Sequence, residues 1–103
     1  MTLTGLLVVL QTTGLAVAYR QWEQPPDLPY LLYYVDNSDN FGADNVAYAG
    51  SLNCIVELYS DRKLLSAETV IENVFRQNDL YFEKSESWIS DENLCLVAYS
   101  INI

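Results

Sequence analysis

The chain has 103 residues, half of them hydrophobic, which suits one folded domain and excludes general disorder. Acidic residues outnumber basic ones by 14 to 5, so the net charge is −9. This balance disfavours binding to free nucleic acid, because that affinity comes chiefly from lysine and arginine contacts with phosphates. The chain also contains no histidine, the commonest general base and metal ligand. We predict a single domain over residues 1–103 and no enzymatic activity.

The N-terminal region is uncharged but fits neither a signal peptide nor a membrane span. Met1–Tyr19 lacks the basic residues that begin a signal peptide, and polar residues and glycines interrupt it. It is also shorter than the roughly 20 apolar residues of a comfortable bilayer crossing. Helical spacing is instead followed by Leu3, Leu6, Leu7 and Leu10. The sequence predicts a short buried helix over Leu3–Thr13, closed by Gly14, in a cytoplasmic protein.

A strand and an extended connection come next. Leu15–Trp22 alternates weakly and predicts a strand. Glu23–Pro29 contains three prolines, which restrict the backbone and remove hydrogen-bond donors.

Two stronger strand patterns follow. Tyr30–Asp36 is aromatic and β-branched with no polar face, so we expect it to be covered on both sides. Leu52–Tyr59 alternates clearly, with Leu52, Cys54, Val56 and Leu58 on one face.

The segment between these strands is rich in turn-forming residues. Asp36–Asn45 consists mainly of Asn, Asp, Ser and Gly, and predicts a loop. Asn45–Ala49 is a candidate short strand that ends in a turn at Gly50–Ser51. Phe41 stands alone among polar residues, either as the anchor of the loop in the core or as an outward contact.

The second helix is expected after a charged turn at Asp61–Lys63. Ser66 suits its N-cap, and the helix should end at Gln77–Asp79. The apolar stripe that we place on the core side consists of Ala67, Val70, Ile71, Val74 and Phe75. The residues that we expect to face away are Glu68, Glu72, Asn73 and Arg76.

Two strands complete the chain, Leu80–Trp88 and Leu94–Ile101, joined by a turn at Ser90–Asn93. The side chains that share one face of the last strand are Cys95, Val97, Tyr99 and Ile101. The element order predicts an α+β fold, with an antiparallel or mixed sheet of about four to six strands and two helices packed on one face. We expect Cys54 and Cys95 to be reduced and packed as small apolar residues.

The sequence contains no phosphate loop, dinucleotide fingerprint or serine nucleophile elbow. Asp36, Ser38 and Asn40 alternate as the ligands of a calcium loop do. Phe41 and Ala47, however, stand where that loop requires Gly and Glu. We therefore predict a structural turn there, and no catalytic, metal or cofactor site.

Four segments carry a pattern that covers nearly the whole chain: Thr12–Tyr19, Pro29–Tyr48, Ile55–Lys63 and Phe82–Ile101. Asn40–Asn45, with the sequence NFGADN, is its most specific part. The pattern resembles the small tail-completion proteins of long-tailed bacteriophages (siphoviruses) and Gram-positive prophages, called tail terminators or tail-to-head joining proteins. The pair Cys54 and Cys95 and the apolar helix entry Leu64–Ser66 depart from what we expect of that family.

The resemblance implies a structural virion protein with no catalytic residues. Such a protein forms a ring, typically a hexamer, which caps the tail tube and joins it to the head connector. Its implied partners are copies of itself, the major tail protein and a head-completion protein, while DNA passes through the ring without specific binding. The implied location is the tail–head junction of the virion, after assembly in the bacterial cytoplasm and without a membrane.

We predict that the central segment lies at an interface with a neighbouring subunit or with the tail tube. The residues of this predicted interface are Tyr33, Asp36, Asn40, Phe41, Asp44, Asn45 and Tyr48. A solvated hairpin loop is the alternative for this segment. For the whole chain, the alternatives are a neighbouring head–tail connector protein and a small acidic binding protein or inhibitor.

Overall fold

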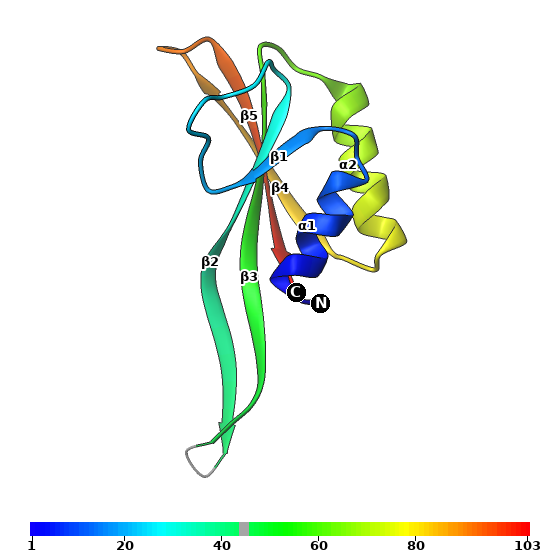
Figure 1. The fold of residues 1–103 in the computed structure, drawn as a ribbon, viewed down its shortest axis with the longest axis vertical. Coiled ribbons are helices and arrows are strands. Elements are labelled where there is room, and N and C mark those ends of the chain that lie inside the picture. The colour runs from blue at the N-terminus through cyan, green and yellow to red at the C-terminus, as the bar shows by residue number, and fades with distance from the viewer. Residues whose placement is uncertain (44–45) are drawn as a thin grey trace.

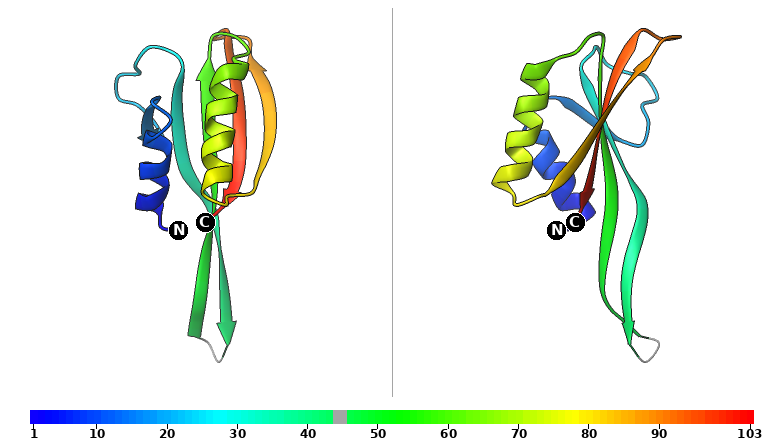
Figure 2. Two further views of the ribbon diagram at one scale, coloured as in Figure 1. Left: turned by 90° about the vertical axis from the view of Figure 1, so that its right-hand side faces the viewer. Right: turned by 180° about the vertical axis from the view of Figure 1, so that it is seen from behind.

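The computed structural model describes residues 1–43 and 46–103, with backbone alone for 39–43 and 46–50. One five-stranded sheet has the order β1-β2-β3-β5-β4, in which β1 and β2 are parallel and the other neighbours are antiparallel. Both helices lie on one face of this sheet (Figures 1 and 2). The predicted α+β fold with a mixed sheet is confirmed. Its elements are α1 (Leu3–Gln11), β1 (Ala16–Tyr19), β2 (Tyr30–Ala43), β3 (Val46–Ser60), α2 (Leu65–Gln77), β4 (Phe82–Ile89) and β5 (Leu94–Asn102).

Helix α1 begins and ends on local signals. The hydroxyl of Thr2 accepts a hydrogen bond from the backbone N–H of Gly5 at 2.9 Å, which caps the first turn. After the helix, Gly14 has a φ of +80°, a conformation that glycine adopts without steric cost. Leu6 and Leu10 are fully buried on the sheet. The predicted helix is therefore confirmed, although it ends two residues earlier than expected.

Helix α2 differs from its prediction in its start and in its orientation. It begins at Leu65 after Leu64, so Ser66 lies inside the helix and is not the N-cap. Val70, expected in the core, is 42% exposed, whereas Glu68, expected to face solvent, is 2% exposed. The buried stripe runs through Glu68, Ile71 and Phe75 because two lysines pair with the Glu68 carboxylate beneath the helix.

The core lies between the helices and the inner face of the sheet. Alternate residues of β5 are buried, and this confirms the predicted face of Cys95, Val97, Tyr99 and Ile101. Phe75 of α2 contacts Phe82 and Tyr99, with ring centroids 5.7 and 5.5 Å apart. Cys54 and Cys95 are free and buried, as predicted, since they lie opposite Ile101 and Ser60 at different points along the β3–β5 pair. Burial raises the pKa of both thiols, which keeps them protonated.

The predicted loop Asp36–Asn45 is wrong over its described part, because β2 continues to Ala43 and pairs with β3 from Val46 onward. The candidate strand Asn45–Ala49 is confirmed over its described residues, 46–49, whereas the turn expected at Gly50–Ser51 is wrong, because β3 continues through it. Backbone pairing satisfies the amides of these polar residues whether or not a side-chain face is buried. Register shifts between Val35 and Asn37 and between Phe41 and Gly42 accommodate the irregular sequence.

Two other strands are displaced from their predicted limits. The first, expected over Leu15–Trp22, is the shorter β1, which stops before Arg20, whose φ is +67°. The strand expected from Leu80 begins at Phe82, because Leu80 and Tyr81 belong to the connection after α2. No helix of the described chain combines the length and apolar content needed to cross a membrane.

Candidate interaction surface on the projecting hairpin

The paired strands β2 and β3 project beyond the rest of the molecule (Figure 1). Strand β1 ends opposite Tyr33, and β5 reaches only Asn53, after which Ile103 forms two backbone hydrogen bonds with Leu52. We call the strand residues beyond these limits, 36–43 and 46–51, the arm. In the described chain each arm strand pairs only with the other, so both outer edges offer backbone donors and acceptors. Open strand edges of this kind can pair with another chain.

The root of the arm is braced by the end of β1. The hydroxyl of Tyr19 accepts a hydrogen bond from the Val35 N–H at 3.3 Å. The guanidinium of Arg20 lies 3.4 Å from the Val35 carbonyl oxygen and 4.9 Å from the ring centroid of Tyr34. Both backbone groups of Val35 thus have side-chain partners where β1 stops. This arrangement closes the edge of β2 just before the arm begins.

A row of amide side chains crosses the sheet at the same level. Asn53 of β3 donates a hydrogen bond to Asn37 of β2 at 2.5 Å, and Asn102 of β5 donates to Asn53 at 2.8 Å. Asn102 also donates to the hydroxyl of Ser51 at 3.1 Å. These bonds join three strands on the face opposite the helices. Together with the brace at Val35, they hold the direction of the arm relative to the body.

The predicted interface residues fall into three groups. Tyr33 is 6% exposed and packs edge-on against Tyr19, so its ring belongs to the core of this chain and is not available to a partner. Asp36 is exposed at the register shift, where it accepts a hydrogen bond from Asn37 at 3.1 Å. The backbone positions of Asn40, Phe41 and Tyr48 lie on the arm, but their side chains are outside the described part. Asp44 and Asn45 lie outside the described residues altogether.

The sheet face opposite the helices is rich in half-buried apolar and aromatic side chains. Tyr30 and Tyr59 stack across β2 and β3 with ring centroids 5.3 Å apart, and Trp22 meets Tyr30 edge-on at 5.9 Å. The other half-buried side chains on this face include Tyr34, Ile55 and Leu96. Burial, together with the nearby carboxylate of Glu57, raises the pKa of Tyr59. Neutral tyrosines on an uncovered sheet are suited to protein contacts.

A cluster of charged side chains beneath α2 was not predicted from the sequence. Lys63 and Lys84 approach the buried carboxylate of Glu68 at 2.9 and 3.2 Å, and Lys63 also bonds to Glu86. Lys84 and the hydroxyl of Tyr99 each donate to Glu72 at 2.9 Å. The only signal in the sequence was the i,i+4 spacing of Glu68 and Glu72, which by itself predicts an exposed helix face.

The charges of this cluster compensate one another. Hydrogen bonds, to Glu86 for Lys63 and to Glu72 for Lys84, raise the pKa of both lysines above the ordinary value. Desolvation opposes ionisation of Glu72, but the bonds from Lys84 and Tyr99 outweigh it and lower its pKa below 4.5. A site for acid–base catalysis needs a pKa shifted toward neutrality. These shifts go the other way, so we interpret the cluster as a structural link between α2 and the β4–β5 pair.

A scan of known protein families and a search of curated proteins find no match for this chain. Over the described residues, no group of three or more Cys, Asp or Glu side chains is placed to hold a metal ion.

Proposed function

We propose that this chain is a structural subunit of a phage particle, a tail terminator that forms a ring on the tail tube and joins it to the head connector. The resemblance of the sequence to tail-completion proteins supplies the class. The arm is the observation that supports the proposal most. A subunit that must bind neighbours needs surfaces that its own fold leaves unpaired, and the arm offers two strand edges.

The uncovered sheet face supports the same conclusion. The helices cover one face of the sheet only (Figure 2). The other face carries the stacked pair Tyr30 and Tyr59 together with neighbouring half-buried side chains. A ring subunit has two different flanks, and each flank contacts the opposite flank of the next copy. The arm and the uncovered face are two such different surfaces on one chain.

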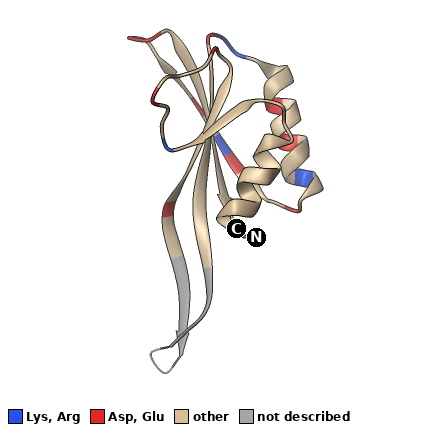
Figure 3. Ribbon diagram, viewed as in Figure 1, with Lys and Arg blue, Asp and Glu red and all other residues tan. Residues whose placement is uncertain are grey.

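The charge of the chain suits a channel through which DNA passes. The net charge is −9. Lysine and arginine residues occur only in short, separate stretches of the described ribbon and form no long basic segment (Figure 3). Acidic groups that line a lumen repel the phosphate backbone, so the DNA does not adhere to the wall. A uniformly basic lumen would contradict this part of the proposal.

The test removes most of the arm, all but residues 36–38, and keeps the body. Ser38 pairs with Leu52, so residues 39–51 can be replaced by an Asn-Gly turn that reconnects the two strands. We expect the shortened chain to fold and to lose ring formation, followed by native mass spectrometry and electron microscopy. The assay is repeated with tail-tube subunits encoded in the same genome, because ring formation can depend on the tube. The intact chain should halt tube growth, and the shortened chain should not.

The control alters a turn at the other end of the molecule. Replacing the turn Ser90–Asn93 by Asn-Gly should leave ring formation and tube capping unchanged. Capping by the shortened chain would contradict the role of the arm. An intact chain that stays monomeric and leaves tube growth unaffected would contradict the whole proposal. Rings that bind only the head connector would assign the chain to the head-completion side of the same junction.

A further inference from the structure

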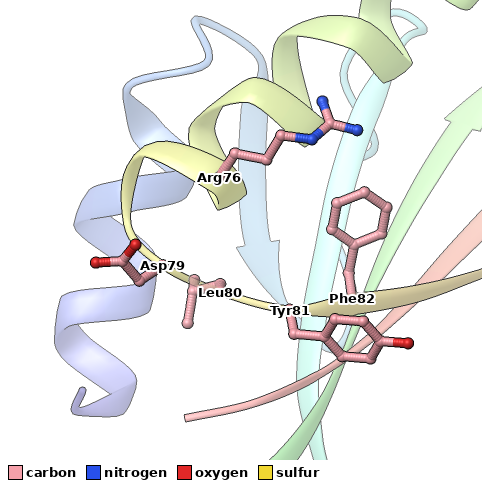
Figure 4. A pocket seen from close by; sticks show the side chains of 5 residues that line it. All are labelled: Arg76, Asp79, Leu80, Tyr81 and Phe82. Atoms are coloured by element: carbon pink, nitrogen blue, oxygen red, sulfur yellow. The ribbon is translucent and has the colours of Figure 1, made fainter.

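The connection between α2 and β4 forms a ridge, Asp79–Tyr81, with a hollow on each side. Asp79 has a φ of +56°, and the N–H of Leu80 donates to the Phe75 carbonyl at 2.8 Å. Leu80 is 8% exposed, whereas Tyr81 is 78% exposed. The core therefore holds the ridge through Leu80 while the tyrosine ring points outward (Figure 4).

The hollow on the helix side of β4 is mainly apolar. Its volume is about 390 Å³, and its lining comprises Arg76, Asp79, Leu80, Tyr81 and Phe82. The Arg76 guanidinium lies 5.6 Å from the Phe82 ring centroid and 3.7 Å from the Glu72 carboxylate. Arg76 is thus held against the wall by groups of its own chain. The space that remains suits an aliphatic side chain.

The hollow on the opposite face of β4 is polar and acidic. It has the same volume, about 390 Å³, and its lining comprises Asn53, Asp79, Tyr81, Glu83, Ser100, Ile101 and Asn102. Asn53 and Asn102 are already bonded to each other at its floor. Among the described residues, the side-chain carboxylates of Asp79 and Glu83 have no hydrogen-bond or ion-pair partner. Two unpaired carboxylates beside an exposed tyrosine ring form a receptor for a side-chain cation.

We propose that this ridge binds a basic, extended segment of another protein, in which a lysine or arginine lies next to an aliphatic residue. Strand β4 is the edge of the sheet, and the two hollows lie on its opposite faces. Successive side chains of an extended peptide also point to opposite faces. A segment beside the edge of β4 therefore places the cation near Glu83 and the aliphatic side chain over Phe82.

The charges of the chain itself argue for a partner other than a second copy. It has five basic residues, and four of them are engaged within the chain. Lys63 and Lys84 pair with carboxylates, Arg20 lies over Tyr34, and Arg76 lies over Phe82. The fifth, Arg62, lies 3.8 Å from the carboxylate of its neighbour Asp61. A second copy of the chain therefore has little free positive charge to offer to the acidic hollow. The inference does not depend on the proposed ring, because a monomer presents the same ridge.

The probe is a blocked peptide that alternates leucine and arginine, with a leucine–glutamate peptide for comparison. Binding is followed by NMR of the backbone amides at low salt. We expect the arginine peptide to shift the amides of residues 79–83 and 100–102, and Glu83→Gln to weaken its binding two- to fivefold. Asp79→Asn combined with Glu83→Gln should weaken it further, and so should Tyr81→Ala.

The control is Asp91→Asn, which removes one exposed carboxylate from the turn between β4 and β5. It loses the same charge and should bind the peptide as the unchanged chain does. For each variant, an NMR spectrum in which the amide signals distant from the substituted residue are unchanged verifies that the chain is folded. Four results would overturn the inference: no binding at low salt, equal binding of the glutamate peptide, shifts confined to other surfaces, or equal weakening by Asp91→Asn. A dimer that the ridge substitutions dissociate would overturn it too, because the occupant is then a second copy.

Discussion

The body and the arm are built from the same two strands but are held together in different ways. Within the body, β2 and β3 bury Leu31, Val56 and Leu58 beneath the helices. Beyond Leu52 no helix of the described chain lies against the strands, and in the described part their backbones bond only to each other (Figure 1). The body therefore derives its stability from apolar burial, whereas the arm depends on backbone pairing and on the bonds at its root.

This contrast separates two properties of the molecule. A change in the core alters the free energy of unfolding, because the whole body shares that core. A change at the root of the arm alters a local equilibrium, and local opening can occur without global unfolding. In the ring that we propose, this separation would let the arm adapt to a partner while the body stays folded.

The largest effect is expected in the core. Phe75 is fully buried and contacts the rings of Phe82 and Tyr99, which also contact each other. Phe75→Ala should lower the free energy of unfolding by about 3–5 kcal/mol, through lost burial and the cavity that remains. Urea denaturation measures this change. The matched control is Val70→Ala on the exposed side of the same helix, with an expected cost below about 0.5 kcal/mol. Similar losses in the two variants would contradict the distinction between the two faces of α2.

An intermediate effect is expected at the charged cluster that ties α2 to β4. The folded chain holds the pKa of Glu72 below 4.5, so it binds fewer protons than the unfolded chain in acid. This stabilisation is complete above pH 4.5 and disappears as the pH falls through the folded pKa. Glu72→Gln should cost about 1–2 kcal/mol near pH 6, and the difference from the unchanged chain should shrink toward about pH 3.

Urea midpoints across this pH range measure the effect. Glu83→Gln is the matched control, because the Glu83 carboxylate has no partner among the described residues and its removal breaks no hydrogen bond or ion pair there. A constant difference between Glu72→Gln and the unchanged chain would show that the charge of Glu72 does not contribute.

The difference between body and arm also explains which parts of the fold could be predicted from the sequence. The alternation from Cys95 to Ile101 predicted a buried face correctly, because a strand that crosses the core must bury every second residue. Glu68 was predicted on the wrong side of α2. Its two lysine partners come from β4 and from the loop before α2, so the periodicity of the helix sequence gives no indication of them. Most of the core could thus be predicted, but the cluster of charges could not.

The arm was missed for a different reason. Asn, Asp, Ser and Gly favour turns, and the described side chains at the start of the segment, Asp36–Ser38, are all exposed, so they show no alternation of buried and exposed residues. The pairing of that segment depends on a second strand that is equally irregular, so no local pattern predicts the register. Four residues of the predicted interface, Asp36, Asn40, Phe41 and Tyr48, nevertheless lie on the arm, whereas Tyr33 lies in the core. The role of the arm as an interface stays a prediction.

The smallest effect on stability is expected at the root of the arm. Tyr19→Phe removes only the hydroxyl that accepts the hydrogen bond from the Val35 N–H. The free energy of unfolding should fall by less than about 1 kcal/mol, the usual net value of one hydrogen bond. Hydrogen exchange of the Val35 amide should accelerate, while amides of the core strand β5 change little. Tyr81→Phe is the matched control, because the Tyr81 side chain is largely exposed, and it should leave exchange at Val35 unchanged. If exchange at Val35 and in β5 accelerated together, the arm and the body would open as one unit and the separation between them would be lost.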